Sequence, residues 1–214
     1  MSAQTEVKTV GIRGRPRSSE KNQSILDAAS RLFLDNGFDN TSMDEIARRA
    51  CVSKQTVYGH FSNKEQLFSE AIRLRCEEYL SATVIESIDE LPLREGLNKL
   101  SLALGHMFVS DDAVSVFRLL SSTGAKDDKL AKLFWAAGPE IMIGRLKGYL
   151  EPWVVSGELE IVDTTKAAIQ LISLLKGTFH DRLAIGLISH VSDKDVENSV
   201  VESVDIFLKI YRKS

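Results

Sequence analysis

Polar side chains crowd positions 54–60 of this 214-residue chain, and their chemistry suits hydrogen bonding to nucleic acid. They are Lys54, Gln55, Thr56, Tyr58 and His60. The lysine and the glutamine are long donors that match guanine O6/N7 and adenine N6/N7 in the major groove. Hydroxyl, phenol and ammonium groups near a helix start donate to phosphate oxygens. This cluster therefore suits DNA binding, a function that depends on the rest of the chain for its support.

The chain around this cluster, residues 42–64, has the pattern of two short helices joined by a tight turn. Ser42 followed by Glu45 forms a capping box at the start of the first helix, and Ser53 can cap the second. Apolar residues recur at helical spacing: Ile46, Ala47, Ala50, Val57 and Phe61. The pattern predicts a helix-turn-helix, whose second helix fits the major groove.

Residues 25–67 resemble the tetracycline-repressor (TetR) family of bacterial transcriptional regulators. The matching residues are Ala28, Phe33, Gly37, Phe38, Thr41, Ile46, Ala47, Val52, Ser53, Thr56, Tyr58, Phe61, Lys64 and Leu67. The resemblance implies that Thr41, Thr56, Tyr58 and Lys64 contact phosphates and that His60 lies near the DNA backbone. Base reading is expected from Lys54 and Gln55.

These assignments have structural alternatives. Thr41 could cap a helix, Tyr58 could pack, His60 could be a packed helix-end histidine, and Lys54 could be an ordinary surface charge. Two residues depart from the family pattern. Cys51 stands where the family usually has the turn glycine, which predicts a relaxed turn or a small strain. Gly59 stands where many relatives have a bulky side chain, so one base or sugar contact is expected to be missing.

The net charge of −3 is unevenly distributed along the chain. Residues 1–64 hold ten Lys/Arg and seven Asp/Glu, whereas residues 65–214 hold seventeen and twenty-three. Basic residues also cluster ahead of the first helix: Lys8, Arg13, Arg15, Arg17 and Lys21. A basic arm before a helix-turn-helix favours contact with phosphate or the minor groove, and we expect Arg13, Arg15 and Arg17 to make it. A solvated tail is the alternative.

No segment shows convincing period-two alternation, so the sequence predicts an all-α fold of about nine helices. A first helix is expected over 19–36, stopped by Gly37, and the two helices of the helix-turn-helix follow. The remaining helices are expected over 64–84, 93–109, 112–122, 127–150 (kinked or broken at Gly138-Pro139), 163–188 and 193–212. We divide the chain into a flexible basic arm (1–18), a three-helix DNA-binding domain (19–65) and a larger helical regulatory and dimerisation domain (66–214).

The C-terminal part resembles the AefR-like regulatory domain found in some TetR-family members. Its most particular elements are Phe134, Gly138-Pro139, Gly157-Glu158-Leu159 and the segment 175–177. The resemblance implies a pocket for a small-molecule inducer, apolar or amphipathic in character. Candidate lining residues are His106, Phe108, Phe117, Arg118, Phe134, Trp135, Met142, Phe179 and His180. The alternative is that the apolar ones form plain core and the polar ones are structural.

Apolar stripes on the last two expected helices suggest a two-fold, four-helix dimer interface, as in this family. The candidate interface residues are Leu171, Leu175, Val200, Val204 and Leu208. The same stripes would also fit packing within one subunit. A dimer is preferred because two reading helices match the half-sites of a palindromic operator.

Other function classes find little support in the sequence. We expect no catalytic residues, metal site or cofactor, because no Cys/His pair, metal-ligand spacing or phosphate-binding glycine loop is present. The apolar runs are too short to span a membrane, and the cysteines, Cys51 and Cys76, fit a reducing cytoplasm. The sequence thus favours a homodimeric, ligand-responsive repressor. The alternative is a protein-interaction module that retains the helix-turn-helix as a scaffold.

Overall fold

The computed structural model describes residues 17–88, 90–123 and 128–213 and confirms the all-α class. These residues form eleven helices and, apart from a single bridge between Leu159 and Arg212, no strand. The helices are α1 (Arg17–Asn36), α2 (Met43–Arg49), α3 (Lys54–His60), α4 (Lys64–Tyr79), α5 (Ala82–Glu86), α6 (Leu93–Val109), α7 (Asp111–Thr123), α8 (Asp128–Ala137), α9 (Pro139–Val155), α10 (Thr164–Ala184) and α11 (Asp193–Tyr211).

Two helix breaks account for the difference from the nine helices expected. The helix that starts at Lys64 ends at Tyr79 rather than at residue 84, because Leu80 leaves the helical conformation and Ser81 caps a new helix, α5. The hydroxyl of Ser81 accepts a hydrogen bond from the Val84 amide at 3.3 Å. The second break falls at Gly138, between α8 and α9, where Pro139 begins the new helix.

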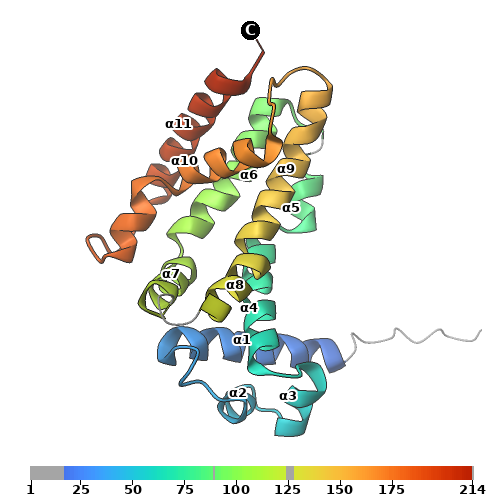
Figure 1. Ribbon diagram of the computed structural model, residues 1–214, viewed down its shortest axis with the longest axis vertical. Helices are drawn as coiled ribbons and strands as arrows, with labels where there is room; N and C mark the ends of the chain where they lie inside the picture. The colour runs from blue at the N-terminus through green and yellow to red at the C-terminus, as the bar shows by residue number, and fades with distance from the viewer. Residues whose placement is uncertain (1–16, 89, 124–127, 214) are drawn as a thin grey trace, which may run out of the picture.

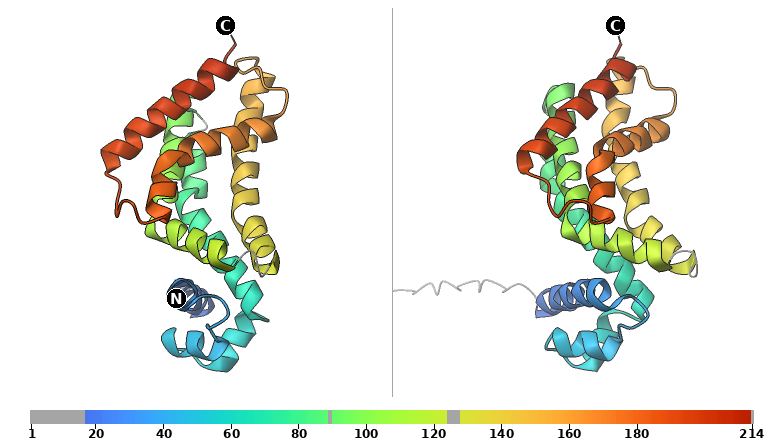
Figure 2. Two further views of the ribbon diagram at one scale, coloured as in Figure 1. Left: turned by 60° about the vertical axis from the view of Figure 1, so that its left-hand side comes forward. Right: turned by 90° about the vertical axis from the view of Figure 1, so that its left-hand side faces the viewer.

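The molecule consists of a small head and a larger helical body (Figure 1). We use "head" for α1–α3 with the start of α4, and "body" for the remainder of α4 with α5–α11. Helix α4 rises from the head into the body, where α7 packs against α1 and α8 packs against α4 (Figure 1). Within the body α11 packs against α6 at the outer edge, and α10 packs against α9 (Figure 2).

The head core is built around three phenylalanines whose ring centroids are each 5.5 Å apart: Phe33, Phe38 and Phe68. Leu130 and Ala137 of α8 belong to the same cluster of buried residues. A second cluster fills the body between α6, α9, α10 and α11. Because α8 contributes to the core of the head, the head and the body share apolar packing. A displacement of one part therefore changes the packing of the other.

Local chemistry explains the start and end of the head helices. The Ser42 hydroxyl accepts from the Glu45 amide at 3.2 Å, and that of Ser53 from the Thr56 amide at 3.1 Å. Gly37 has a φ of +83°, which stops α1 where the sequence predicts. These caps fix the two helices of the helix-turn-helix.

In the part of the chain that the structure describes, no single helix is long and apolar enough to span a bilayer. Only α6 together with α7 reaches the required length and composition, and these two helices are bent by 56° at their junction.

Candidate nucleic-acid interface and ligand cavity

Helix α3 buries one face and exposes the other. Val57 is fully buried against the head core and Phe61 ends the helix in the same core. The opposite face carries Gln55, which is exposed, and Tyr58, which is 47% exposed. Helix α3 itself lies at the end of the molecule farthest from the C-terminal helices of the body (Figure 1). It can therefore enter a groove of DNA without a clash from the body.

The side chain of Lys54 is held by α2. Its ammonium nitrogen lies 2.8 Å from an Asp44 carboxylate oxygen and 5.9 Å from the centre of the Tyr58 ring. The hydrogen bond that Lys54 donates to Asp44 raises the pKa of Lys54. Both partners of this ion pair are well exposed, so the pair is weak. To bind a base, the Lys54 ammonium therefore has to break its ion pair with Asp44, or keep it while donating a second hydrogen bond to the base.

Thr56 and His60 lie at the two ends of α3. The hydroxyl of Thr56 is 2.8 Å from the hydroxyl of its capping residue Ser53. His60 is half-buried, and its ring centre lies 6.2 Å from that of Phe61. Thr56 keeps hydrogen-bonding capacity for a phosphate, because a hydroxyl can donate one bond and accept two.

Thr41 and Lys64 are placed differently from the expectation that both contact phosphates. Thr41 is only 2% exposed, and its hydroxyl lies 3.0 Å from the carbonyl oxygen of Leu32 and 2.8 Å from that of Gly37. The single hydroxyl proton is thus committed inside the head. Lys64 donates to the carbonyls of Phe38, Asp39 and Thr41, which uses its three protons. We therefore assign both residues to holding the loop between α1 and α2.

The expected basic arm cannot be placed. Arg13 and Arg15 lie outside the described residues, as does the side chain of Arg17, the first residue of α1. The structure shows two exposed cations that the sequence reasoning missed, Arg48 and Arg49 at the end of α2. Two adjacent arginines in the last turn of the first helix of a helix-turn-helix indicate a basic surface, and this pattern is visible in the sequence.

The turn between α2 and α3 is strained at Cys51, which is one of the two alternatives that the sequence predicts. Cys51 has a φ of +54°, the left-handed conformation in which an L side chain is disfavoured, and its side chain is exposed. No other non-glycine residue in the described ranges has a positive φ. Gly59 leaves open space: a Cβ atom there would meet nothing within 4 Å.

A cavity of about 420 Å³ lies where the head meets the body. Its wall is mostly apolar and aromatic and comes from α1, α4 and α6–α10. Six of the nine expected lining residues are on this wall: Phe108, Phe117, Phe134, Trp135, Met142 and His180. A volume of this size suits a small organic molecule.

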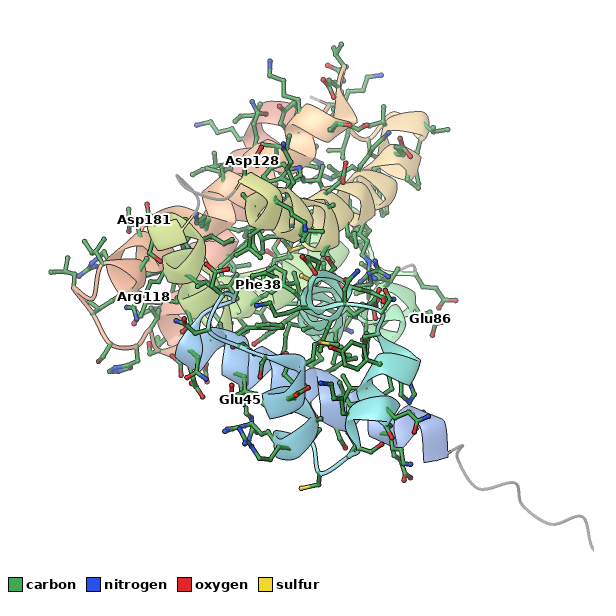
Figure 3. All side chains as sticks on the ribbon, turned by 60° about the horizontal axis from the view of Figure 1, so that its bottom comes forward. Phe38, Glu45, Glu86, Arg118, Asp128 and Asp181 are labelled. Carbon is green, nitrogen blue, oxygen red and sulfur yellow. The ribbon has the colours of Figure 1, made fainter. Side chains whose placement is uncertain are left out.

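The other three expected lining residues lie elsewhere. Arg118 donates to the backbone carbonyls of Leu183 and Ala184, the latter at 2.8 Å, and so caps the end of α10. Figure 3 shows it at the α7–α10 edge of the body, on the same side as Asp181. His106 faces α11, with its Nδ1 atom 3.9 Å from Asp193. Phe179 is half-buried and is not part of the cavity wall.

Residues of the head itself line the cavity, which the sequence reasoning missed. They are Ser30, Phe33 and Leu34 of α1, with Phe68, Ala71 and Ile72 of α4. Apart from Ser30 these residues are apolar, and no periodic pattern distinguishes an apolar head residue that faces a cavity from one that faces the core, because both point inward. Phe33 does both, since it also belongs to the aromatic trio.

The expected dimer residues are buried within one chain, which contradicts their assignment to an interface between chains. Each of them is at most 6% exposed and belongs to the core of the body: Leu171, Leu175, Val200, Val204 and Leu208. A side chain enclosed by its own subunit cannot contact a second copy. The apolar residues of α11 that do face outward are Val201, Ile206 and Ile210.

Charged residues connect the cavity wall to the head. The Arg75 guanidinium on α4 lies 3.8 Å from Asp27 of α1, 2.9 Å from Glu78 and 3.2 Å from Asp112 of α7. Lys129 of α8 lies 2.8 Å from Glu65 at the start of α4. Helix α4 is therefore tied by ion pairs to α1, α7 and α8.

Cys76 also lines the cavity. Burial raises the pKa of its thiol to about 11, so the group is neutral at physiological pH and behaves as a small apolar residue. In the described part of the chain, no three His, Cys, Asp or Glu residues are grouped so that they could hold a metal ion.

Comparisons with known proteins agree in both halves of the chain. Residues 25–71 match a family model described as bacterial regulatory proteins, tetR family, and residues 95–213 match one described as the C-terminal domain of an AefR-like transcriptional repressor. The chain is 31% identical over 165 residues to the uncharacterized HTH-type transcriptional regulator YdeS of Bacillus subtilis (strain 168), covering 75% of this chain and 78% of that protein.

Solved structures show the same fold over nearly the whole length. A putative TetR-family transcriptional regulator from Mesorhizobium loti is 26% identical, with a TM-score of 0.77, and the match covers 93% of this chain and 100% of that one. The flavonoid-responsive regulator FrrA is 32% identical, with a TM-score of 0.69, over 91% of this chain and 98% of that one.

Proposed function

Because the chain belongs to the tetR family of bacterial transcriptional regulators, we propose that it is a homodimeric repressor that a small molecule releases from a palindromic operator. In this proposal residues 1–18 are a basic arm, 19–65 read DNA in the cytoplasm, and 66–214 bind ligand and dimerise. Helix α3 enters the major groove, with Gln55 and Lys54 toward the bases and Thr56, Tyr58 and His60 toward the backbone.

The observation that carries the ligand response is the shared wall of the cavity. Six head residues, three from α1 and three from α4, line the same space as residues of α6–α10. A molecule that fills this space contacts the head directly and changes how α1 and α4 pack against α7 and α8. It can favour a head orientation that no longer fits the operator, to the extent that it binds the two orientations with different affinity.

A small apolar or amphipathic effector fits this wall. The similarity to FrrA, a regulator described as flavonoid-responsive, supports a response to a small molecule here as well.

The two-fold partner is proposed to pack on the outer face of α11. Ile206 and Ile210, which lie one turn apart, are 47% and 64% exposed and give this helix an apolar side that its own subunit leaves uncovered. A dimer places two α3 helices on one face of DNA, with half-sites about 34–36 Å apart.

The test is binding of the purified full chain to DNA from upstream of its own gene. DNase footprinting should show a protected palindrome, and fluorescence anisotropy across a salt series should show an affinity that falls steeply with salt. Tyr58→Ala should weaken binding to all sequences, whereas Gln55→Ala should change the preference among operator variants. Salt-independent binding, or no preferred sequence, contradicts the proposal.

Dimerisation is tested separately by sedimentation. Ile206→Glu should shift the protein toward monomer and weaken operator binding. Leu187→Glu is the matched control, because Leu187 is a 65% exposed apolar residue that lies in the loop after α10 rather than on α11. If both variants remain dimeric, the interface lies elsewhere.

A further inference from the structure

One histidine of the cavity wall has a buried hydrogen-bond acceptor without a partner among the described residues. His180 is 4% exposed and lines the cavity wall. Its Nδ1 atom lies 2.8 Å from the carbonyl oxygen of Phe108. A carbonyl can only accept, so Nδ1 carries the proton, and in the neutral ring Nε2 is left as a bare acceptor. No hydrogen-bond partner for Nε2 exists among the described residues.

The ring remains neutral near physiological pH. Burial lowers the pKa of His180, and the positive charge of Lys176 lowers it further, although the Phe108 carbonyl and Asp181 act in the opposite direction. An unsatisfied buried acceptor costs free energy. A ligand that donates a hydrogen bond to Nε2 removes that cost.

Lys176 supplies a positive charge to the same part of the wall. Its ammonium lies 4.6 Å from the centre of the Phe117 ring, and Phe117 in turn packs edge-on against His180 with ring centres 5.0 Å apart. None of the carboxylates that the structure describes lies within ion-pair distance of Lys176. A cationic donor and the ring that carries the neutral acceptor thus both contact Phe117, on the same part of the wall.

The backbone of α10 brings these two residues to the wall. Gly177, between them in the sequence, has a φ of +50° and a ψ of −151°, and α10 is kinked there. Only glycine adopts that conformation readily. The kink separates the first part of α10 from the last turns, where His180 lies.

From these contacts we propose that the cavity binds a neutral aromatic compound whose hydroxyl group donates to Nε2 of His180 and accepts from Lys176. A hydroxyl is suited to this position because it can donate and accept at once. The aromatic part fits the rings of the surrounding wall, which include Phe33, Phe108 and Phe134.

A carboxylate ligand fits less well. It would pair with Lys176, but its oxygen lone pairs would face the lone pair of Nε2. The other cation on the wall, Arg75, already has three carboxylates within 4 Å. The acceptor at His180 therefore selects a hydroxyl over an acid.

The inference rests on the proposed function, in which this cavity is the effector site, but it is tested without DNA. Equilibrium dialysis of the full chain should be carried out with three matched probes: 4′-hydroxyflavanone, flavanone and flavanone-4′-carboxylic acid. The hydroxylated probe should bind about three- to tenfold more tightly than flavanone, the amount expected for one hydrogen bond. The acid should bind no more tightly than flavanone.

Variants assign the preference to the two residues. His180→Phe should bind the hydroxylated and parent probes equally, and Lys176→Met should reduce the preference. His106→Phe is the matched control, since His106 lies outside the cavity, and should keep the wild-type preference. If His180→Phe does not fold, Lys176→Met decides the result.

Three results would overturn the inference: tightest binding of the acid, equal binding of hydroxylated and parent probes by the wild type, or a preference that persists in the variants. Binding of none of the probes would overturn it as well. Operator binding by the wild type is measured independently, so a failure of the proposed function is seen as loss of that binding while the probe preference remains.

Discussion

The ammonium nitrogen of Lys64, at the start of α4, lies 3.0 Å from the backbone carbonyl oxygen of Thr41, just before α2. It also donates to the carbonyls of Phe38 and Asp39, and it lies 4.4 Å from the centre of the Phe38 ring. The hydroxyl of Thr41 in turn donates toward the end of α1. One cation thus fixes the loop between α1 and α2 relative to α4, and with it the position of the helix-turn-helix.

Lys64→Met should destabilise the protein by about 1–2 kcal/mol, because carbonyls that accepted a charged hydrogen bond lose their donor in a half-buried site. Urea unfolding measures the change. Thr41→Val tests the neighbouring contact and should also destabilise. If Lys64→Met leaves stability unchanged but lowers the salt dependence of operator binding by about one counterion, the residue contacts phosphate after all.

Asp44→Asn should increase affinity for every DNA sequence, because it removes a negative charge beside Lys54 on the reading surface. The salt dependence of binding should become steeper by about 0.9 in its logarithmic slope if Lys54 then neutralises one more phosphate. Anisotropy titrations at several salt concentrations measure both quantities. Glu140→Gln, at an exposed position at the start of α9, is the control and should leave the slope unchanged.

Cys51→Gly should stabilise the protein by about 0.5–1 kcal/mol, since a glycine avoids the left-handed penalty of roughly 1–2 kcal/mol but costs more backbone entropy. Denaturant unfolding measures the gain. Cys51→Ala retains the Cβ atom and should give no such gain. Equal effects of the two substitutions would show that the turn is not strained by its side chain.

Gly177→Ala should destabilise the protein by about 1–3 kcal/mol although a Cβ atom there would meet nothing within 4 Å, because the cost comes from the backbone conformation alone. Thermal unfolding measures the loss. Gly144→Ala, in the regular part of α9 with equally open surroundings, is the control and should stabilise slightly. A neutral effect at both positions would contradict the strain argument.

The stability of the protein should depend on pH through His180. Burial keeps the pKa of the folded histidine below its ordinary value of 6.5. The unfolded chain therefore binds a proton first as pH falls below about 6.5, so the free energy of unfolding decreases until pH reaches the folded pKa.

Urea unfolding between pH 7.5 and 5.5 measures this dependence as the difference between the wild type and His180→Gln, which should lose stability less steeply. His190→Gln, at an exposed histidine before α11, should retain the wild-type slope. A wild-type slope in His180→Gln would mean that other groups cause the loss.

The sequence predicts the helices well where the controlling chemistry is local. Ser42, Ser53 and Gly37 each act on the next or preceding turn, and their helix ends lie where the pattern indicates. The end of α4 was placed too late because the apolar periodicity continues past Leu80, whereas the cap at Ser81 starts a separate helix.

The site was less predictable because it depends on contacts between distant segments. Arg118 looks like a ligand-binding residue on an apolar helix, but its partners are carbonyls about 65 residues further along the chain. The apolar stripes of α10 and α11, which include Leu171 and Val204, would look the same whether they pack on another helix of the same chain or on a second chain. Only the three-dimensional packing distinguishes these cases.

Phe33 belongs both to the cavity wall and to the aromatic trio of the head. This double membership limits how the protein can evolve. A change at Phe33 that accommodates a new molecule also disturbs the fold of the reading helices, so it alters two traits at once. Met142 and His180, on the part of the wall formed by α9 and α10, do not belong to the core of the head. Substitutions on α9 and α10 can therefore change the shape of the cavity without altering the aromatic trio that supports the reading helices.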